Sequence, residues 1–397
     1  RGQEGKARID VGFNATVKNP SKLPNKLDSY DALMARNVAV EHELALMGAD
    51  SWSYVRPQAF IENYRNQTTV EQMERYPNVD WQKALFNDFA MSYQANVNVS
   101  GGTKFVKYFA SADYINEGDL FKVYPNNRGY ESGYGYDRIN VRSNLDFSIT
   151  PTTTLRVNLS GSSAKRTAPT MNSSNDIWQI QQQWAGAYGI APDVFLPVYS
   201  DGAWGMYPNA SNVTNSAENL SVGGRFETTT NRINTDFTLE QDLKFITPGL
   251  SLRGVISWDN QFVESSRGIS DMYNNPQRKW IDPVTGIETY AYPFDSYHHF
   301  DYRQPIKWTT GGGSVNNWST LRNLYYQGQI NYARTFAEKH DVTAMGLFSR
   351  QENATGSMIP LYREDWAFRA TYSWNGRYHA EYNGAYNGSE KLADVNR

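Results

Sequence analysis

Acidic side chains on one alternating segment are the first residues in this sequence that could carry out chemistry. Hydrolysis of a glycosidic bond needs two carboxylates placed on either side of that bond. Asp236, Glu240 and Asp242 supply carboxylates within one short segment whose odd positions are largely apolar. In an extended strand, even and odd positions lie on opposite faces, so the three carboxylates share one polar face. We therefore expect them to line a water-filled space, and we predict no catalytic residue and no enzymatic activity.

Two further clusters could suggest a metal site or a phosphate site. His298 and His299 precede Asp301, but adjacent side chains point apart in an extended chain and no third ligand is suitably spaced. The stretch from Gly311 to Ser314 lacks the Lys-Ser/Thr pair of a phosphate-binding loop. Both clusters are therefore predicted to be loop, and no metal or cofactor is expected.

Aromatic residues in long polar segments are the stronger candidates for ligand binding. Flat aromatic faces stack on sugar rings and supply hot spots for protein partners. The alternative is that these residues pack the loops together or contact lipid headgroups. As candidate substrate-binding residues we take Trp204, Tyr207, Trp280, Tyr292 and Trp308.

The overall composition restricts which kind of structure holds these residues. Aromatic residues make up 14% of the chain, yet the mean hydropathy is −0.65. A disordered chain is poor in aromatic residues, whereas a membrane β-barrel exposes alternate residues to lipid and to water and carries aromatic girdles. A net charge of −3 gives no signature of nucleic-acid binding. There is no cysteine, which excludes disulfides and thiolate sites.

Alternation with a period of two residues predicts the elements themselves. Apolar and polar residues alternate, for example, in Ile139, Val141 and Leu145 against Asn140 and Arg142. By this criterion we expect about eleven strands, most of them near the length that a tilted membrane strand needs. They are predicted near residues 7–18, 92–100, 104–116, 137–149, 154–165, 225–245, 250–265, 319–335, 341–353, 364–374 and 377–388.

The connections between these strands alternate between short and long. Short turns rich in Gly, Pro and Asn-Gly are predicted near residues 101, 151, 247, 338 and 375. Long segments separate them, with helices expected at 28–47 and 173–186 and an irregular loop at 266–318. Outer-membrane barrels have short periplasmic turns and long extracellular loops. We therefore predict an all-β fold, a transmembrane antiparallel β-barrel with long extracellular loops. Because such barrels need an even number of strands, we expect the chain to be truncated.

Several segments resemble the SusC/RagA-type TonB-linked outer-membrane transporters of Bacteroidetes. The basic, glycine-containing residues 1–8 resemble the family's junction between plug and barrel. The element Val79-Asp80-Trp81-Gln82 resembles one that precedes the family's second strand. Ser100-Gly101-Gly102 and the tyrosine-rich strand after it resemble the family's first hairpin. Residues 138–146 resemble the next strand, and residues 387–391 a glycine-serine turn about midway round the barrel.

The resemblance implies a domain division and a function. Residues 1–6 would be the end of the plug and residues 7–397 the N-terminal half of a 22-stranded barrel. The whole protein would lie in the outer membrane of a Gram-negative, Bacteroidetes-like cell, in contact with outer-membrane lipid. It would import oligosaccharides or peptides with a SusD-like surface lipoprotein, and TonB would supply energy through the plug. Two alternatives remain open, a passive porin and a soluble or secreted β protein that binds or degrades glycans.

Overall fold

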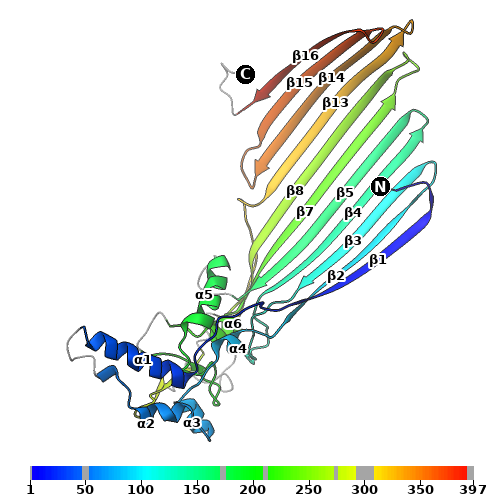
Figure 1. Cartoon of the computed structure of the whole chain (residues 1–397). Coiled ribbons are helices and arrows are strands. Elements are labelled where there is room, and N and C mark those ends of the chain that lie inside the picture. The colour runs from blue at the N-terminus through cyan, green and yellow to red at the C-terminus, as the bar shows by residue number, and fades with distance from the viewer. Residues whose placement is uncertain are drawn as a thin grey trace.

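The computed structural model describes residues 2–46, 53–169, 176–208, 213–271, 276–291 and 308–390. Figure 1 shows two parts, a broad curved sheet of long strands and a smaller lobe of helices and loops at one end of those strands. No helix within these residues is long and apolar enough to cross a membrane.

The sheet is antiparallel, and its order follows the chain. Eleven long strands pair consecutively in the order β1-β2-β3-β4-β5-β7-β8-β13-β14-β15-β16, and two short strands, β11 and β12, pair with β8. In the described part of the chain, β1 and β16 are the two ends of this order. The long strands are β1 (Gly5–Lys18), β2 (Ala90–Gly102), β3 (Val106–Glu117), β4 (Gly135–Thr150), β5 (Thr153–Ala168), β7 (Arg225–Asp242), β8 (Leu250–Ser270), β13 (Leu321–Phe336), β14 (His340–Thr355), β15 (Leu361–Trp374) and β16 (Tyr378–Ser389).

The two faces of the sheet differ in polarity. Residues paired across antiparallel strands lie on the same face. One row of paired residues is polar throughout: Asp10, Asn98, Ser111, Arg142, Ser160, Asn234 and Asp259. The adjacent row on the opposite face has no polar side chain from β1 to β7, where it consists of Val11, Val97, Ala112, Val141, Gly161 and Ile233, and it reaches Asn260 on β8. Its large side chains are exposed. We call these the polar face and the apolar face.

Tight turns close the hairpins at the end of the sheet away from the lobe. Between β15 and β16, Asn375 has a φ of 51° and Gly376 a φ of 66°. Both central residues of a type I′ turn need positive φ, which Asn-Gly tolerates best. Ala337 and Glu338 have the same left-handed backbone between β13 and β14. We call this end of the sheet the short-turn end.

Four long connections meet at the opposite end and form the loop lobe (Figure 1). They join β1 to β2 (19–89), β3 to β4 (118–134), β5 to β7 (169–224) and β8 to β13 (271–320), and we number them first to fourth. Their elements are α1 (Ser29–Leu44), α2 (Gln58–Ile61), the 3₁₀ helix η2 (Glu62–Tyr64), α3 (Val70–Arg75), α4 (Trp81–Leu85), α5 (Asp176–Gly189), β6 (Trp204–Gly205), α6 (Ser216–Val222), β9 (Arg278–Ile281), β10 (Glu288–Tyr290), β11 (Thr309–Gly311) and β12 (Ser314–Val315).

Sequence patterns predicted most of these elements. All eleven long strands are confirmed, and so is the helix expected at 28–47, where Asp28 caps α1 by accepting a hydrogen bond from the Asp31 amide at 2.8 Å. The expected helix at 173–186 corresponds to α5. The prediction of an irregular loop over 266–318 is wrong in part, because β8 extends to Ser270 and β9 to β12 lie within that range.

The prediction of a loop from Gly311 to Ser314 is also wrong in part. Gly311 belongs to β11 and Ser314 to β12, and both strands pair with β8 instead of forming a free loop. These strands have only three and two residues, too few to produce a detectable period. The expectation for His298, His299 and Asp301 lies outside the described residues.

Candidate functional site

The loop lobe has its own apolar core, built from all four connections. Trp81 and Phe86 from the first connection pack with Phe121 from the second and Phe195 from the third. The ring centroids of Trp81 and Phe195 lie 5.3 Å apart, with the rings edge to face. Trp280, from the fourth connection, packs against this cluster. Because segments far apart in sequence share one core, the lobe is a packed unit and not a set of separate loops.

A buried lysine ties three of the connections together. Lys279 on β9 is almost fully buried, and its Nζ lies 2.7 Å from Asp201 Oδ2 in the third connection. Glu74 on α3 and Glu288 on β10 each bring a carboxylate oxygen to within 3.7 Å of the same Nζ. The Tyr199 ring packs under the ammonium at 4.7 Å. A buried ammonium needs such partners, because burying an unpaired charge is very costly.

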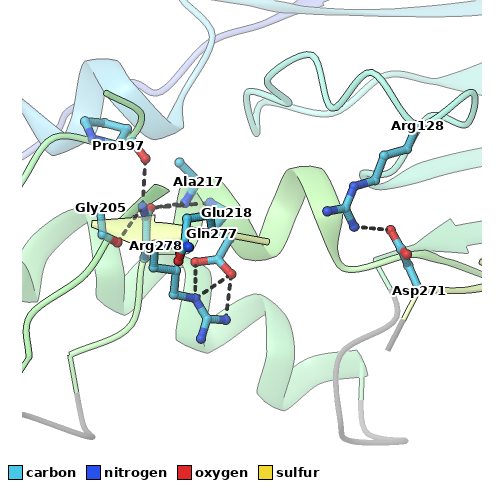
Figure 2. A network of polar contacts seen from close by, with 9 residues as sticks. Arg128, Pro197, Gly205, Ala217, Glu218, Asp271, Gln277 and Arg278 are labelled. Carbon is cyan, nitrogen blue, oxygen red and sulfur yellow. Dashed lines mark hydrogen bonds and ion pairs between the residues drawn. The ribbon is translucent and has the colours of Figure 1, made fainter. Parts of the chain in front are cut away.

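Two arginine–carboxylate pairs add further links (Figure 2). Arg278 donates from Nε and Nη2 to the Glu218 carboxylate of α6, with contacts of 2.6 to 2.9 Å. Arg128, in the second connection, pairs with Asp271 at 2.5 Å, and both side chains are almost completely buried. The Tyr130 hydroxyl also donates to Asp271 Oδ2, at 2.7 Å. The forked Arg278–Glu218 contact fixes orientation as well as distance, so it holds the third and fourth connections in a defined arrangement.

Burial changes the acidity of several of these groups. Burial raises the pKa of the Glu218 carboxyl, although the hydrogen bonds and charge of Arg278 act in the opposite direction. Burial and the hydrogen bond to Asp271 raise the pKa of the Tyr130 hydroxyl. On the outside of the lobe, the hydrogen bond with Asp193 raises the pKa of the Arg36 guanidinium. Burial, therefore, favours the neutral form of Glu218 and Tyr130.

A hollow of about 240 Å³ opens beside the Arg278–Glu218 pair. Tyr207, Thr214 and Asn219 line it together with the two charged residues. Tyr207 is 39% exposed, and its ring meets the Trp280 ring edge to face at 6.0 Å. Hydroxyl, amide and charged groups beside an aromatic ring can bind a polar ligand by hydrogen bonding and stacking.

The candidate aromatic residues fall into different environments. Trp204 is buried in the core of the lobe, where its ring meets the Tyr124 ring at 6.4 Å. Trp308 is half-buried and donates from Nε1 to the Arg128 carbonyl at 2.9 Å. Tyr207 and Trp280 lie together, whereas Tyr292 lies outside the described residues. Their role in substrate binding stays a prediction, and of the four described residues Tyr207 presents the most exposed ring at the hollow.

A second hollow lies on the polar face of the sheet. It has a volume of about 440 Å³ over β3, β4, β5 and β7, and Arg142, Asn144, Asn158, Asn234 and Asp236 line it. Sequence analysis placed Asp236 on a polar, space-lining face, and this location is confirmed. The other lining residues were not among the candidates. Their alternation with apolar neighbours predicts that they lie on the polar face, but alternation alone does not predict where that face forms a hollow.

The remaining carboxylates of that strand are paired with cations. Glu240 Oε1 lies 2.7 Å from Arg156 Nη1 and 3.9 Å from Arg253 Nε. Asp242 lies 3.8 Å from Lys244. Among the described residues, no group of His, Cys, Asp and Glu is arranged to hold a metal ion.

Comparison with known proteins supports the fold. No protein-family model matches the sequence, and no curated protein matches it either. Three solved chains described as the RagAB peptide transporter or importer match over 100% of this chain. They show TM-scores of 0.58, 0.57 and 0.60 and sequence identities of 15%, 16% and 15%; the last two represent the closed-closed and open-open states.

The match covers only part of each solved chain. This chain spans 44%, 44% and 43% of their lengths, so it corresponds to less than half of each. At this identity the likeness concerns the fold. The described structure is an all-β, antiparallel barrel-type sheet with long connections at one end, similar to part of a RagAB transporter chain, as the SusC/RagA-type resemblance predicted.

Proposed function

We propose that this chain forms about half of the barrel of an outer-membrane nutrient importer, and that the importer has no enzymatic activity. The observation that carries the proposal is the two-sided sheet, with exposed apolar residues on one face and charged and amide residues on the other. In water, so wide an exposed apolar surface is unfavourable and promotes association. In a bilayer the same surface meets lipid, while the polar face encloses an aqueous lumen.

TonB-dependent uptake is the mechanism that we propose for the whole protein. Solved chains with this fold belong to a transporter, and this chain spans less than half of their length. A plug that ends at residues 1–6 would occupy the lumen and contact the hydrogen-bonding groups of the polar face. Arg142, Asn158 and Asp236 could pair with such a plug or with a passing ligand. Energy from TonB would then move the plug and open a path through the barrel.

The loop lobe is the proposed capture site on the outside of the cell. A lobe held by its own core and by buried ion pairs presents a preorganised surface, and preorganisation reduces the entropic cost of binding. A SusD-like lipoprotein is the proposed partner at this surface. Oligosaccharides and peptides are the proposed ligand classes, because the hollow beside Tyr207 offers both a stacking ring and hydrogen-bonding groups.

Uptake measurements in a strain that carries the full-length gene would test this proposal. We expect gene deletion to abolish uptake of either labelled oligosaccharides or labelled peptides at nanomolar supply, and complementation to restore it. Collapse of the proton-motive force should stop uptake equally well. Uptake that continues without the proton-motive force would favour the passive porin, and unchanged uptake of both ligand classes after deletion would contradict the importer.

A further inference from the structure

An apolar trough crosses the apolar face of β8, β13, β14 and β15. It has a volume of about 460 Å³, which lies within the usual range of roughly 300–1,000 Å³ for small-molecule sites. Its floor is backbone at Gly328 and Gly346, and its walls include Ile330, Phe348 and Trp366. The Phe348 and Trp366 rings lie 4.5 Å apart and form a continuous wall.

The trough offers no polar side chain to a ligand. Gln329 borders it only through its backbone, because its side chain bonds to Gln327 and Asn331 on the polar face. A side chain added at Gly328 would meet no atom within 4 Å, so the space above this residue is open. A long, flexible hydrocarbon fits such a surface, whereas a polar ligand would lose its hydrogen bonds there.

Groups suited to a lipid headgroup lie toward the short-turn end of the same face. Arg334 is four residues beyond Ile330 on β13, about 13 Å along the strand at roughly 3.3 Å per residue. Its side chain is exposed and packs over the Phe336 ring at 4.8 Å. His340 and the Tyr372 hydroxyl, linked at 2.7 Å, lie on the two neighbouring strands. By the strand pairing, Tyr372 lies level with Arg334, and His340 lies one row nearer the turn. Lipid interfaces favour such aromatic groups with polar tips, and cations, at the border of an apolar surface.

We propose that the trough is a binding site for one phospholipid of the periplasmic leaflet. One acyl chain would lie against Gly328 and the Phe348–Trp366 wall, and the headgroup phosphate would pair with Arg334. The inference rests on the proposed function, because that function places the short-turn end at the periplasmic side of the membrane. It goes further by assigning a specific lipid position to an otherwise general lipid-facing surface.

Photo-crosslinking on the full-length protein tests this site. The probe is a phosphatidylglycerol with a diazirine in its acyl chain, present in trace amounts in phosphatidylethanolamine vesicles. We expect labels to concentrate on Phe348 and Trp366 relative to Ile233, which is as exposed as Trp366 and more exposed than Phe348. Gly328→Leu fills open space and should lower trough labelling several-fold, whereas Ala112→Leu, elsewhere on the apolar face, should leave it unchanged.

The headgroup contact has its own matched pair of variants. Arg334→Gln should weaken trough labelling about fivefold, since one basic side chain contributes modestly to anionic-lipid binding. Lys104→Gln, at another short turn, should have no effect. Even labelling of the whole apolar face would overturn the site while leaving the membrane placement intact. Labelling of Ile233 without labelling of Phe348 or Trp366 would also overturn the site, and absence of labelling on either face would contradict the proposed function itself.

Discussion

The buried ammonium of Lys279 provides a sharp test of whether the loop lobe is one preorganised unit. Lys279→Met keeps a long side chain but removes the positive charge that lies within 3.7 Å of Glu74, Asp201 and Glu288. Three carboxylates then face one another without their shared cation. Removing one partner of a fully buried ion pair costs about 3–5 kcal/mol.

The expected cost here is smaller, because water reaches part of the cluster. The Lys279 side chain is 3% exposed, but those of Asp201 and Glu288 are 31% and 47% exposed. Solvent screening reduces the penalty for such groups, so we expect a loss of about 2–3 kcal/mol in the free energy of local unfolding. That loss corresponds to an opening equilibrium raised by about 30- to 150-fold.

Hydrogen–deuterium exchange on the full-length protein measures this opening directly. The informative amides are those of Trp204 and Met206, which donate to the carbonyls of Gln277 and Lys279 between β6 and β9. They should exchange faster in Lys279→Met, while amides of the long strands stay protected. Lys83→Met is the matched control, because Lys83 is 85% exposed in its contact with Asp80 in the same lobe. Equal exchange in the two variants would refute the argument that the ion cluster holds the lobe together.

Three further predictions concern the two faces of the sheet, the pKa of Glu218, and the aromatic residues of the loop lobe. Leu159→Arg should destabilise membrane assembly by roughly 2–4 kcal/mol if the position is near midplane, whereas Asn158→Arg on the polar face should be mild, as a folding assay in lipid would measure. Burial raises the pKa of Glu218, so the protonated carboxyl stabilises the folded lobe relative to the ionised one. This stabilisation is fully present below the ordinary pKa of glutamate and is lost as pH rises through the folded-state pKa. Glu218→Gln should therefore flatten the pH dependence of lobe opening at pH values above the ordinary pKa of glutamate, and an unchanged slope in hydrogen exchange would contradict this. Trp280→Ala with Trp308→Ala should lower ligand capture or docking of the SusD-like lipoprotein about tenfold for each aromatic anchor that matters, with barrel levels in the membrane unchanged, and normal uptake would assign both residues to packing.

Local patterns predicted the sheet because one physical rule governs every strand. Each long strand separates an apolar face from a polar face, so alternation shows its position, and turn residues such as Asn375 and Gly376 show where it ends. The helix after Asp28 is equally local, since the cap and the helix are adjacent in sequence. These features need no knowledge of distant contacts.

The lobe was less predictable because distant segments define it. The three-stranded sheet of β6, β9 and β10 joins residues more than seventy positions apart, and β6 pairs with β9 in parallel. Trp204 and Tyr207 are near neighbours in one segment, yet the first ring is buried and the second is partly exposed. Lys279 follows Arg278 like an ordinary solvated basic pair, although its ammonium is buried. Whether a side chain in one connection is buried depends on how the other connections pack against it.

The central claim, that the apolar face meets lipid and the polar face meets water, can be measured at two adjacent residues. Because the sequence contains no cysteine, Ile233→Cys and Asn234→Cys each give the full-length protein one reactive site in this part of the chain. Both native side chains are exposed, and they lie on opposite faces of β7. A fluorophore at position 233 should be quenched by nitroxide-labelled acyl chains and protected from aqueous iodide, with the reverse at position 234. Equal quenching of both positions by iodide, with no effect of the lipid quencher, would contradict the membrane barrel.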